Sequence, residues 1–125
     1  MKYLVIDAAN LKILFSIIVD GKSYTNSYSN SRENFDKLTT LLLEFLEKNK
    51  IQLNQIEKIF INQGPGKFSS IRTSLSIAKA ISLTKNISLY GFNSNDINNG
   101  NYLKLIDLEK KGFLTKDLIN PIYSS

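Results

Sequence analysis

The chain has 125 residues, a net charge of +5 and 42% hydrophobic residues, which predicts one folded domain with a substantial core. It contains neither cysteine nor histidine. These absences exclude disulfides, thiolate zinc sites, paired-histidine zinc sites and the catalytic systems that depend on a Ser–His or Cys–His pair. The sixteen Lys and Arg residues are spread from Lys2 to Lys116, which does not favour a dedicated nucleic-acid groove.

The N-terminal sequence reaches the carboxylate of Asp7 after only four apolar residues, which is too short for the core of a signal peptide. No apolar run approaches the length of a membrane span. We therefore expect a soluble, cytoplasmic protein that does not associate with membranes.

The first part of the chain predicts three consecutive strands. Tyr3–Ile6 is continuously apolar, as in a central strand that is buried on both faces. Leu11–Val19 is also largely apolar, and Asp20-Gly21 is typical of a two-residue hairpin turn. Lys22–Tyr28 alternates polar and aromatic residues, which indicates a more exposed third strand.

A first helix is predicted from about Ser31 to Asn49, with Asn30 as its N-cap and Glu33 as the capping-box partner. Its apolar stripe consists of Phe35, Leu38, Leu41, Leu42, Phe45 and Leu46. This stripe predicts packing against the sheet.

A glycine loop, Gly64-Pro65-Gly66, separates a predicted strand at Lys58–Asn62 from a predicted helix at Phe68–Lys85. Glycines permit positive φ angles or a close approach by another group, and the start of the following helix has free N–H groups. The loop alone therefore leaves two interpretations open, an anion-binding cradle or a structural connector. The helix is rich in Ser, Thr and Ala, which suits a helix between the sheet and a second helix.

A fifth strand at Ile87–Phe92 completes the order β-β-β-α-β-α-β. This order predicts a single α/β domain of the actin-like or ribonuclease-H-like type over residues 1–92. Residues 93–125 are expected to form a short remnant of a second domain, or a tail packing on the first. This tail includes a short helix at Tyr102–Lys111 and an edge segment at Leu118–Tyr123.

Asp7 lies where enzymes with this fold carry a catalytic carboxylate. Metal-assisted chemistry needs several clustered oxygen ligands, but the fourth strand ends in Asn62-Gln63. The turn Asp7-Ala8-Ala9-Asn10 also lacks the glycine that lets phosphates approach in actin-like kinases. A structural role for Asp7 is favoured, and an enzyme with its own nucleotide or metal site at Asp7 is the alternative.

The nonapeptide from Gly64 to Arg72, followed by Leu75-Ser76-Ile77-Ala78-Lys79-Ala80, resembles the signature of the TsaB (YeaZ) family. The opening Leu4-Val5-Ile6-Asp7-Ala8-Ala9 and the closing Asn120-Pro121-Ile122-Tyr123 are similar to further motifs of that family. Most family members carry a larger second domain, so the chain resembles a truncated member.

The resemblance implies a non-catalytic scaffold or activator subunit. Such a subunit binds a TsaD-like catalytic paralogue in the synthesis of N6-threonylcarbamoyladenosine on tRNA. It also implies that ATP and a metal ion belong to partner subunits, that a TsaE-like ATPase joins the assembly, and that tRNA is contacted only through the complex. Isolated family members also form homodimers.

The resemblance implies that the partner is bound through the two predicted helices. The residues expected at that interface are Phe68, Ile71, Arg72, Leu75 and Ile77 on the second helix, with Leu38 and Leu42 on the first. No catalytic residue, metal ligand or cofactor site is expected in this chain. With this resemblance, the glycine loop is interpreted as the hinge that sets the second helix into a layer facing the partner.

Overall fold

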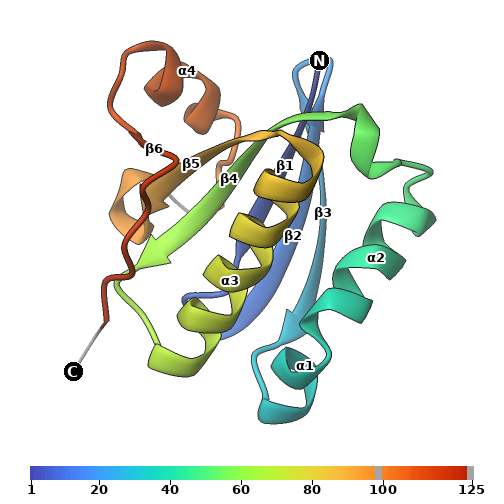
Figure 1. Cartoon of the computed structure of the whole chain (residues 1–125), viewed down its shortest axis with the longest axis vertical. Helices are drawn as coiled ribbons and strands as arrows, with labels where there is room; N and C mark the ends of the chain where they lie inside the picture. Colours follow the sequence, from blue (N-terminus) through green and yellow to red (C-terminus); the bar gives the residue numbers. More distant parts are fainter. Residues whose placement is uncertain (98–99, 124–125) are drawn as a thin grey trace.

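The computed structural model describes residues 1–97 and 100–123. In this part of the chain, six strands form one sheet in the order β3-β2-β1-β4-β5-β6 (Figure 1). β1 pairs antiparallel with β2 and parallel with β4, β4 pairs parallel with β5, and β5 pairs antiparallel with β6. The strands are β1 (Lys2–Asp7), β2 (Lys12–Val19), β3 (Lys22–Ser29), β4 (Ile56–Gly64), β5 (Ser88–Asn93) and β6 (Thr115–Lys116).

The predicted hairpin is confirmed between β2 and β3. Asp20 and Gly21 both have positive φ, at 52° and 72°, as a type I′ turn requires. β1 is buried from Tyr3 to Asp7, because the sheet is covered on both faces at its centre. β3 is the largely exposed edge strand, as its polar sequence predicts.

The single helix predicted over Ser31–Asn49 is instead two helices, α1 (Arg32–Asp36) and α2 (Leu38–Lys48). Lys37 between them has non-helical angles, with φ −118° and ψ 31°. The N-cap is Ser31, whose side chain accepts a hydrogen bond from the Asn34 backbone N–H, and not Asn30. The Asn30 side chain instead donates to the carbonyls of Ala8 and Asn10, so it ties the first turn to the start of the helical segment.

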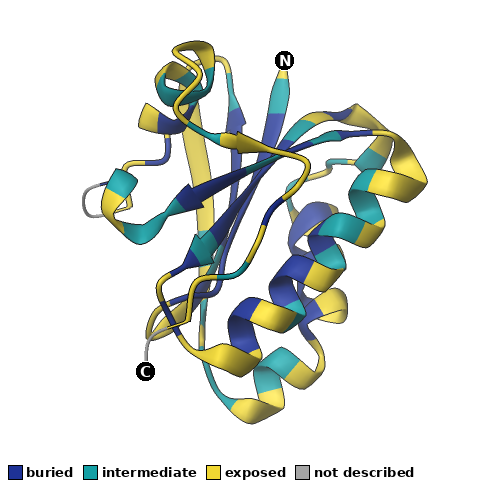
Figure 2. Ribbon diagram, turned by 60° about the vertical axis from the view of Figure 1, so that its left-hand side comes forward, coloured by how far each residue is buried: buried dark blue, intermediate teal, exposed yellow. Residues whose placement is uncertain are grey.

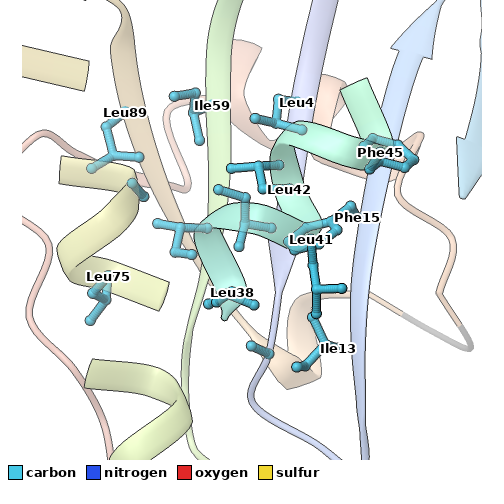
Figure 3. Packing of buried hydrophobic residues seen from close by; sticks show 14 of the residues in the cluster. Leu4, Ile13, Phe15, Leu38, Leu41, Leu42, Phe45, Ile59, Leu75 and Leu89 are labelled. Atoms are coloured by element: carbon cyan, nitrogen blue, oxygen red, sulfur yellow. The ribbon is translucent and has the colours of Figure 1, made fainter. Parts of the chain in front are cut away.

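The helices α2 and α3 (Phe68–Lys85) cover one face of the sheet, and α4 (Lys104–Lys110) covers the other (Figure 2). The first core lies between the sheet and α2 and α3, and in Figure 3 Leu38, Leu42 and Leu75 lie among side chains of the strands. The second core lies on the opposite face, where Tyr102 and Leu105 from the tail cover Val5 and Phe60. The alternation of side chains along the strands therefore supplies both cores.

The tail is attached to the sheet, but its strand is not the segment that the sequence predicted. β6 lies at Thr115–Lys116, whereas an edge segment was expected at Leu118–Tyr123. Ile119 inserts into the first core and is almost fully buried, while Leu118 is largely exposed. Only Tyr123, at the end of the predicted segment, forms a bridge, and its partner is Gly66.

The arrangement is the predicted mixed α/β fold, with the order β-β-β-α-β-α-β preserved once α1 and α2 are taken together. The boundary predicted at residues 92 and 93 stays a prediction. Among residues 1–97 and 100–123, no helix combines the length and the apolar character that a membrane span needs.

Replacing Phe45 with Ala should strongly destabilise the protein. The Phe45 side chain is fully buried, with its ring centroid 5.8 Å from that of Phe15. The cavity left by the substitution should lower the free energy of unfolding by about 3–5 kcal/mol. Leu43→Ala, at a half-exposed position of the same helix, is the control and should cost less than about 1 kcal/mol. Equal losses for the two variants in urea unfolding would show that the core is not packed on Phe45.

Candidate functional site

The glycine loop lies against two other parts of the same chain. Gly64 has φ +117°, and a β-carbon there would lie 2.0 Å from the carbonyl oxygen of Ile122. A β-carbon on Gly66 would lie 2.2 Å from the carbonyl oxygen of Ala9. Only glycine permits such approaches. The backbone around Ala9 and Ile122 therefore packs directly on the loop.

The C-terminal segment Ile119–Tyr123 is held against the loop by further contacts. The Ile122 backbone N–H donates to the Gln63 carbonyl at 2.7 Å, and Tyr123 bridges to Gly66. The Tyr123 ring centroid lies 4.6 Å from that of Phe68, the first residue of α3. The C-terminal segment thus lies at the carboxyl end of β4, where open α/β sheets commonly bind ligands.

Asp7 lies at the carboxyl end of β1 and is almost completely buried, with 4% of its surface exposed. Its Oδ1 accepts a hydrogen bond from Asn62 Nδ2 at 2.9 Å, and its Oδ2 accepts one from the Tyr102 hydroxyl at 2.8 Å. Asn62 Oδ1 accepts from the Gly64 N–H at 2.9 Å. These contacts connect the first strand, the glycine loop and the tail.

The protonation of this network follows from its burial. Burial raises the pKa of the Asp7 carboxyl, while hydrogen bonds from Tyr102, Asn62 and the Ala9 backbone oppose that rise. Burial and the neighbouring Asp7 carboxylate also raise the pKa of Tyr102, so its hydroxyl stays protonated and can donate. A small cavity of about 200 Å³ lies beside Asp7, Asn62 and Tyr102.

Among the described residues, no group of three or more His, Cys, Asp or Glu side chains is placed to hold a metal ion. Glu33, Glu44 and Glu47 are exposed on α1 and α2. The geometry of Asp7 suits a structural acceptor for neighbouring donors.

The structure separates the seven residues expected at a partner interface into two groups. Phe68 and Arg72 are exposed on one side of α3, and Ile77 is half-buried on another side of the same helix. The other four are buried in the first core and cannot form a surface contact in this fold: Leu38, Leu42, Ile71 and Leu75. A partner role for the first three stays a prediction.

The seven expected interface residues do not include Leu43 and Ala80, which lie at the surface of the helices, and the sequence did not predict the contact between Tyr102 and Asp7. Leu43 is half-exposed, and Ala80 is exposed on α3. Leu43 lies outside the main apolar stripe, and this was the available signal. Nothing local marks the contact between Tyr102 and Asp7, because the two residues are 95 positions apart.

Replacing Asp7 with Asn should make the protein less sensitive to pH. Because the folded-state pKa of Asp7 is raised, the folded state binds this proton more tightly than the unfolded state does. The stability from the protonated carboxyl is present below the unfolded-state pKa and is lost as the pH rises through the folded-state pKa. Asn stays neutral and still accepts a hydrogen bond from Asn62. The difference in unfolding free energy between Asp7→Asn and the wild type should therefore increase as the pH rises from about 3 to about 7. A constant or decreasing difference in urea unfolding would contradict this interpretation.

The comparison with protein families identifies a match over residues 24–99 to the family described as "TsaD: tRNA N6-adenosine threonylcarbamoyltransferase". A curated relative, the tRNA threonylcarbamoyladenosine biosynthesis protein TsaB of Buchnera aphidicola subsp. Baizongia pistaciae, is 42% identical over 50 residues. That match covers 40% of this chain and 23% of the relative. A tRNA N6-adenosine threonylcarbamoyltransferase of Clostridioides difficile is 35% identical over 86 residues, covering 68% of this chain and 25% of the relative. The matched segments thus span about a quarter of these relatives.

Solved structures show the same fold. YeaZ from Pseudomonas aeruginosa superposes with a TM-score of 0.70 at 14% identity, over 89% of this chain and 50% of that chain. RuvC of Thermus thermophilus, in complex with Holliday junction substrate, superposes with a TM-score of 0.61 at 9% identity, over 93% of this chain and 99% of that chain. At these identities the structures establish the actin-like, ribonuclease-H-like fold alone. Together with the family match and the curated TsaB relatives, they show that the chain belongs to the TsaB (YeaZ) family, within the wider group that the TsaD family describes.

Proposed function

We propose that this chain is a non-catalytic subunit that binds a TsaD-like paralogue in the synthesis of N6-threonylcarbamoyladenosine on tRNA. The observation that carries this proposal is a largely uncharged outer face on the paired helices α2 and α3, bordered by the exposed Glu47 one turn after Leu43. We call it the helical face and define it by Thr39 and Leu43 of α2 and Thr73, Ile77 and Ala80 of α3, all of them exposed or half-buried.

Helical geometry places these residues on neighbouring flanks. Burial, and then the nearby Glu44 carboxylate, raise the pKa of Tyr28 in β3, so Glu44 lies on the flank of α2 that faces β3. Thr39 and Leu43, one helical turn apart, therefore lie on the other flank of α2, toward α3. Ile77 packs partly against the first core, and Thr73 and Ala80 lie about one turn before and after it. Small side chains at these positions would let a partner helix approach closely.

The buried network around Asp7 supports the non-catalytic part of the proposal. Tyr102 and Asn62 each donate to one oxygen of the buried Asp7 carboxylate, so a metal ion would compete with these two donors for it. In this proposal ATP and the metal ion belong to the partner subunits, with a TsaE-like ATPase completing the assembly. Self-association through the helical face is expected when the partner is absent.

Placing a charge on the helical face should abolish the complex and leave the protein folded. Ile77→Glu would also disturb the core, so Leu43→Glu and Ala80→Glu are the sharper variants because both positions are exposed. A charge buried without a partner in an interface costs about 2–5 kcal/mol, so affinity should fall at least about thirtyfold. The measurement is capture of a TsaD-like protein by the tagged chain from a native lysate, with mass-spectrometric identification.

Phe113→Glu is the matched control, because Phe113 is 71% exposed and lies after α4, on the opposite side of the sheet. It should capture the partner as well as the wild type does. Normal capture by Leu43→Glu and Ala80→Glu, with unchanged thermal unfolding, would contradict the assignment of the helical face.

The alternative is an enzyme with a nucleotide or metal site at Asp7. It predicts that the purified chain binds ATP in a Mg²⁺-dependent way and that Asp7→Ala removes this binding. A scaffold subunit should show no such difference between the wild type and the variant in isothermal titration calorimetry. Binding that is lost in Asp7→Ala, while the variant stays folded, would favour the enzyme.

A further inference from the structure

The net positive charge of the chain is concentrated in one segment. Between Lys58 and Asn95 the sequence contains five basic residues and no acidic residue, and this difference alone equals the net charge of +5. The segment includes all of α3, whose charged residues are Arg72, Lys79 and Lys85. Four of these basic residues, Lys67, Arg72, Lys79 and Lys85, lie in or next to α3, whereas Lys58 forms an ion pair with Glu109.

The basic residues of α3 lie outside the helical face. Lys79 and Leu83 line a cavity with residues of the C-terminal segment, and Phe68 stacks on Tyr123. Arg72 lies one turn after Phe68, with its guanidinium 5.6 Å from the centre of the Phe68 ring. We call this side of the helix the basic flank and define it by Lys67, Phe68, Arg72, Lys79 and Leu83.

One end of the basic flank presents aromatic rings to solvent. Phe68 is 53% exposed and Tyr123 is 42% exposed, although the two rings are in contact. Exposed aromatic rings beside a guanidinium form a surface on which unpaired nucleobases stack.

The other end of the basic flank opens into a cavity of about 700 Å³ between α3 and the C-terminal segment. Two exposed leucines, Leu83 and Leu118, line it together with the exposed amide side chains of Asn86 and Asn120. Asp117 is the acidic residue in the lining, and its Oδ1 accepts a hydrogen bond from the Leu89 N–H. The leucine side chains could pack against the face of a nucleobase, and the amide groups could form hydrogen bonds with its edge.

We infer that the basic flank and its cavity bind single-stranded RNA. Arg72 and Lys79 would contact phosphates, Phe68 and Tyr123 would stack with bases, and the cavity would receive a further base. From Phe68 to Leu83 the helix rises by about 22 Å, which matches about six stacked nucleotides at about 3.4 Å each. An acidic protein would also satisfy the charges, but exposed aromatic rings beside a guanidinium are the arrangement on which unpaired bases stack.

RNA binding by this flank requires no partner subunit, so it can hold or fail independently of the complex proposed above. It would be a direct contact with RNA, whereas the family resemblance implies that tRNA is contacted only through the complex.

The test is a fluorescence anisotropy titration of the full chain with a labelled single-stranded RNA of about ten nucleotides and mixed sequence. Arg72→Gln with Lys79→Gln should weaken binding at least about tenfold and make the dependence of log affinity on log salt shallower by about 1.4. Lys104→Gln with Lys110→Gln removes the same charge from α4, where both residues are exposed, and should change affinity by less than about threefold. Tyr123→Ala should also weaken binding about tenfold, whereas Phe113→Ala should not.

Thermal unfolding of each variant establishes that the fold is retained. Stronger binding of the single strand than of a duplex of the same sequence supports the assignment. If the double variant at Arg72 and Lys79 and the double variant at Lys104 and Lys110 weaken binding equally, the proposal is overturned. RNA would then be attracted by the overall positive charge and not by the basic flank. Tighter binding of an oligoglutamate peptide than of RNA at the same salt concentration would also overturn it, in favour of an acidic protein ligand.

Discussion

The structure depends on two places where one backbone touches another. The carbonyl oxygens of Ile122 and Ala9 lie 2.0 Å and 2.2 Å from the positions that β-carbons on Gly64 and Gly66 would take. Through these contacts, the glycine loop packs between the first turn of the chain and the C-terminal segment. Asn62 extends the same arrangement inward, because its side chain accepts from the Gly64 N–H and donates to Asp7. The start of α3 is therefore fixed by residues from the beginning, middle and end of the described chain.

In enzymes with open α/β sheets, the carboxyl edge of the central strands commonly holds a ligand, and glycines there let it approach the backbone. Here the same edge holds the C-terminal segment and the Tyr102 hydroxyl. The interpretation of the loop changes accordingly. Its glycines admit the chain's own backbone, and the contact between Phe68 and Tyr123 extends this packing to the first residue of α3. A loop that resembles a phosphate cradle in the sequence thus positions a helix and its surfaces.

Local patterns predicted most of the fold and little of the site. Continuous apolar runs identified β1 and β4, and Asp20-Gly21 identified the hairpin, because both depend on neighbouring residues alone. The break at Lys37 was missed, since no glycine or proline marks it and the apolar stripe continues across it. Periodicity grouped Ile71 with Leu75 on one face of α3 but could not tell whether that face meets the sheet or a partner. Both are buried, as are Leu38 and Leu42. The contact between Tyr102 and Asp7 joins positions far apart in the sequence, so only the folded chain reveals it.

The helical face and the basic flank of α3 differ in charge. A helix that binds a protein subunit and RNA at the same time would need this difference. A helix turns by about 100° per residue. Thr73 and Ala80 are therefore about two turns apart on one side of α3, and Phe68, Arg72 and Lys79 lie on another side. A charged residue on the helical face would lose its hydration in an interface between helices, at a cost of several kcal/mol. Charges on the basic flank remain hydrated and can neutralise phosphates without that cost. The same helix can therefore present a dry surface to a protein and a basic one to RNA, provided that its orientation is fixed. The glycine loop, clamped between Ala9 and Ile122, supplies that constraint.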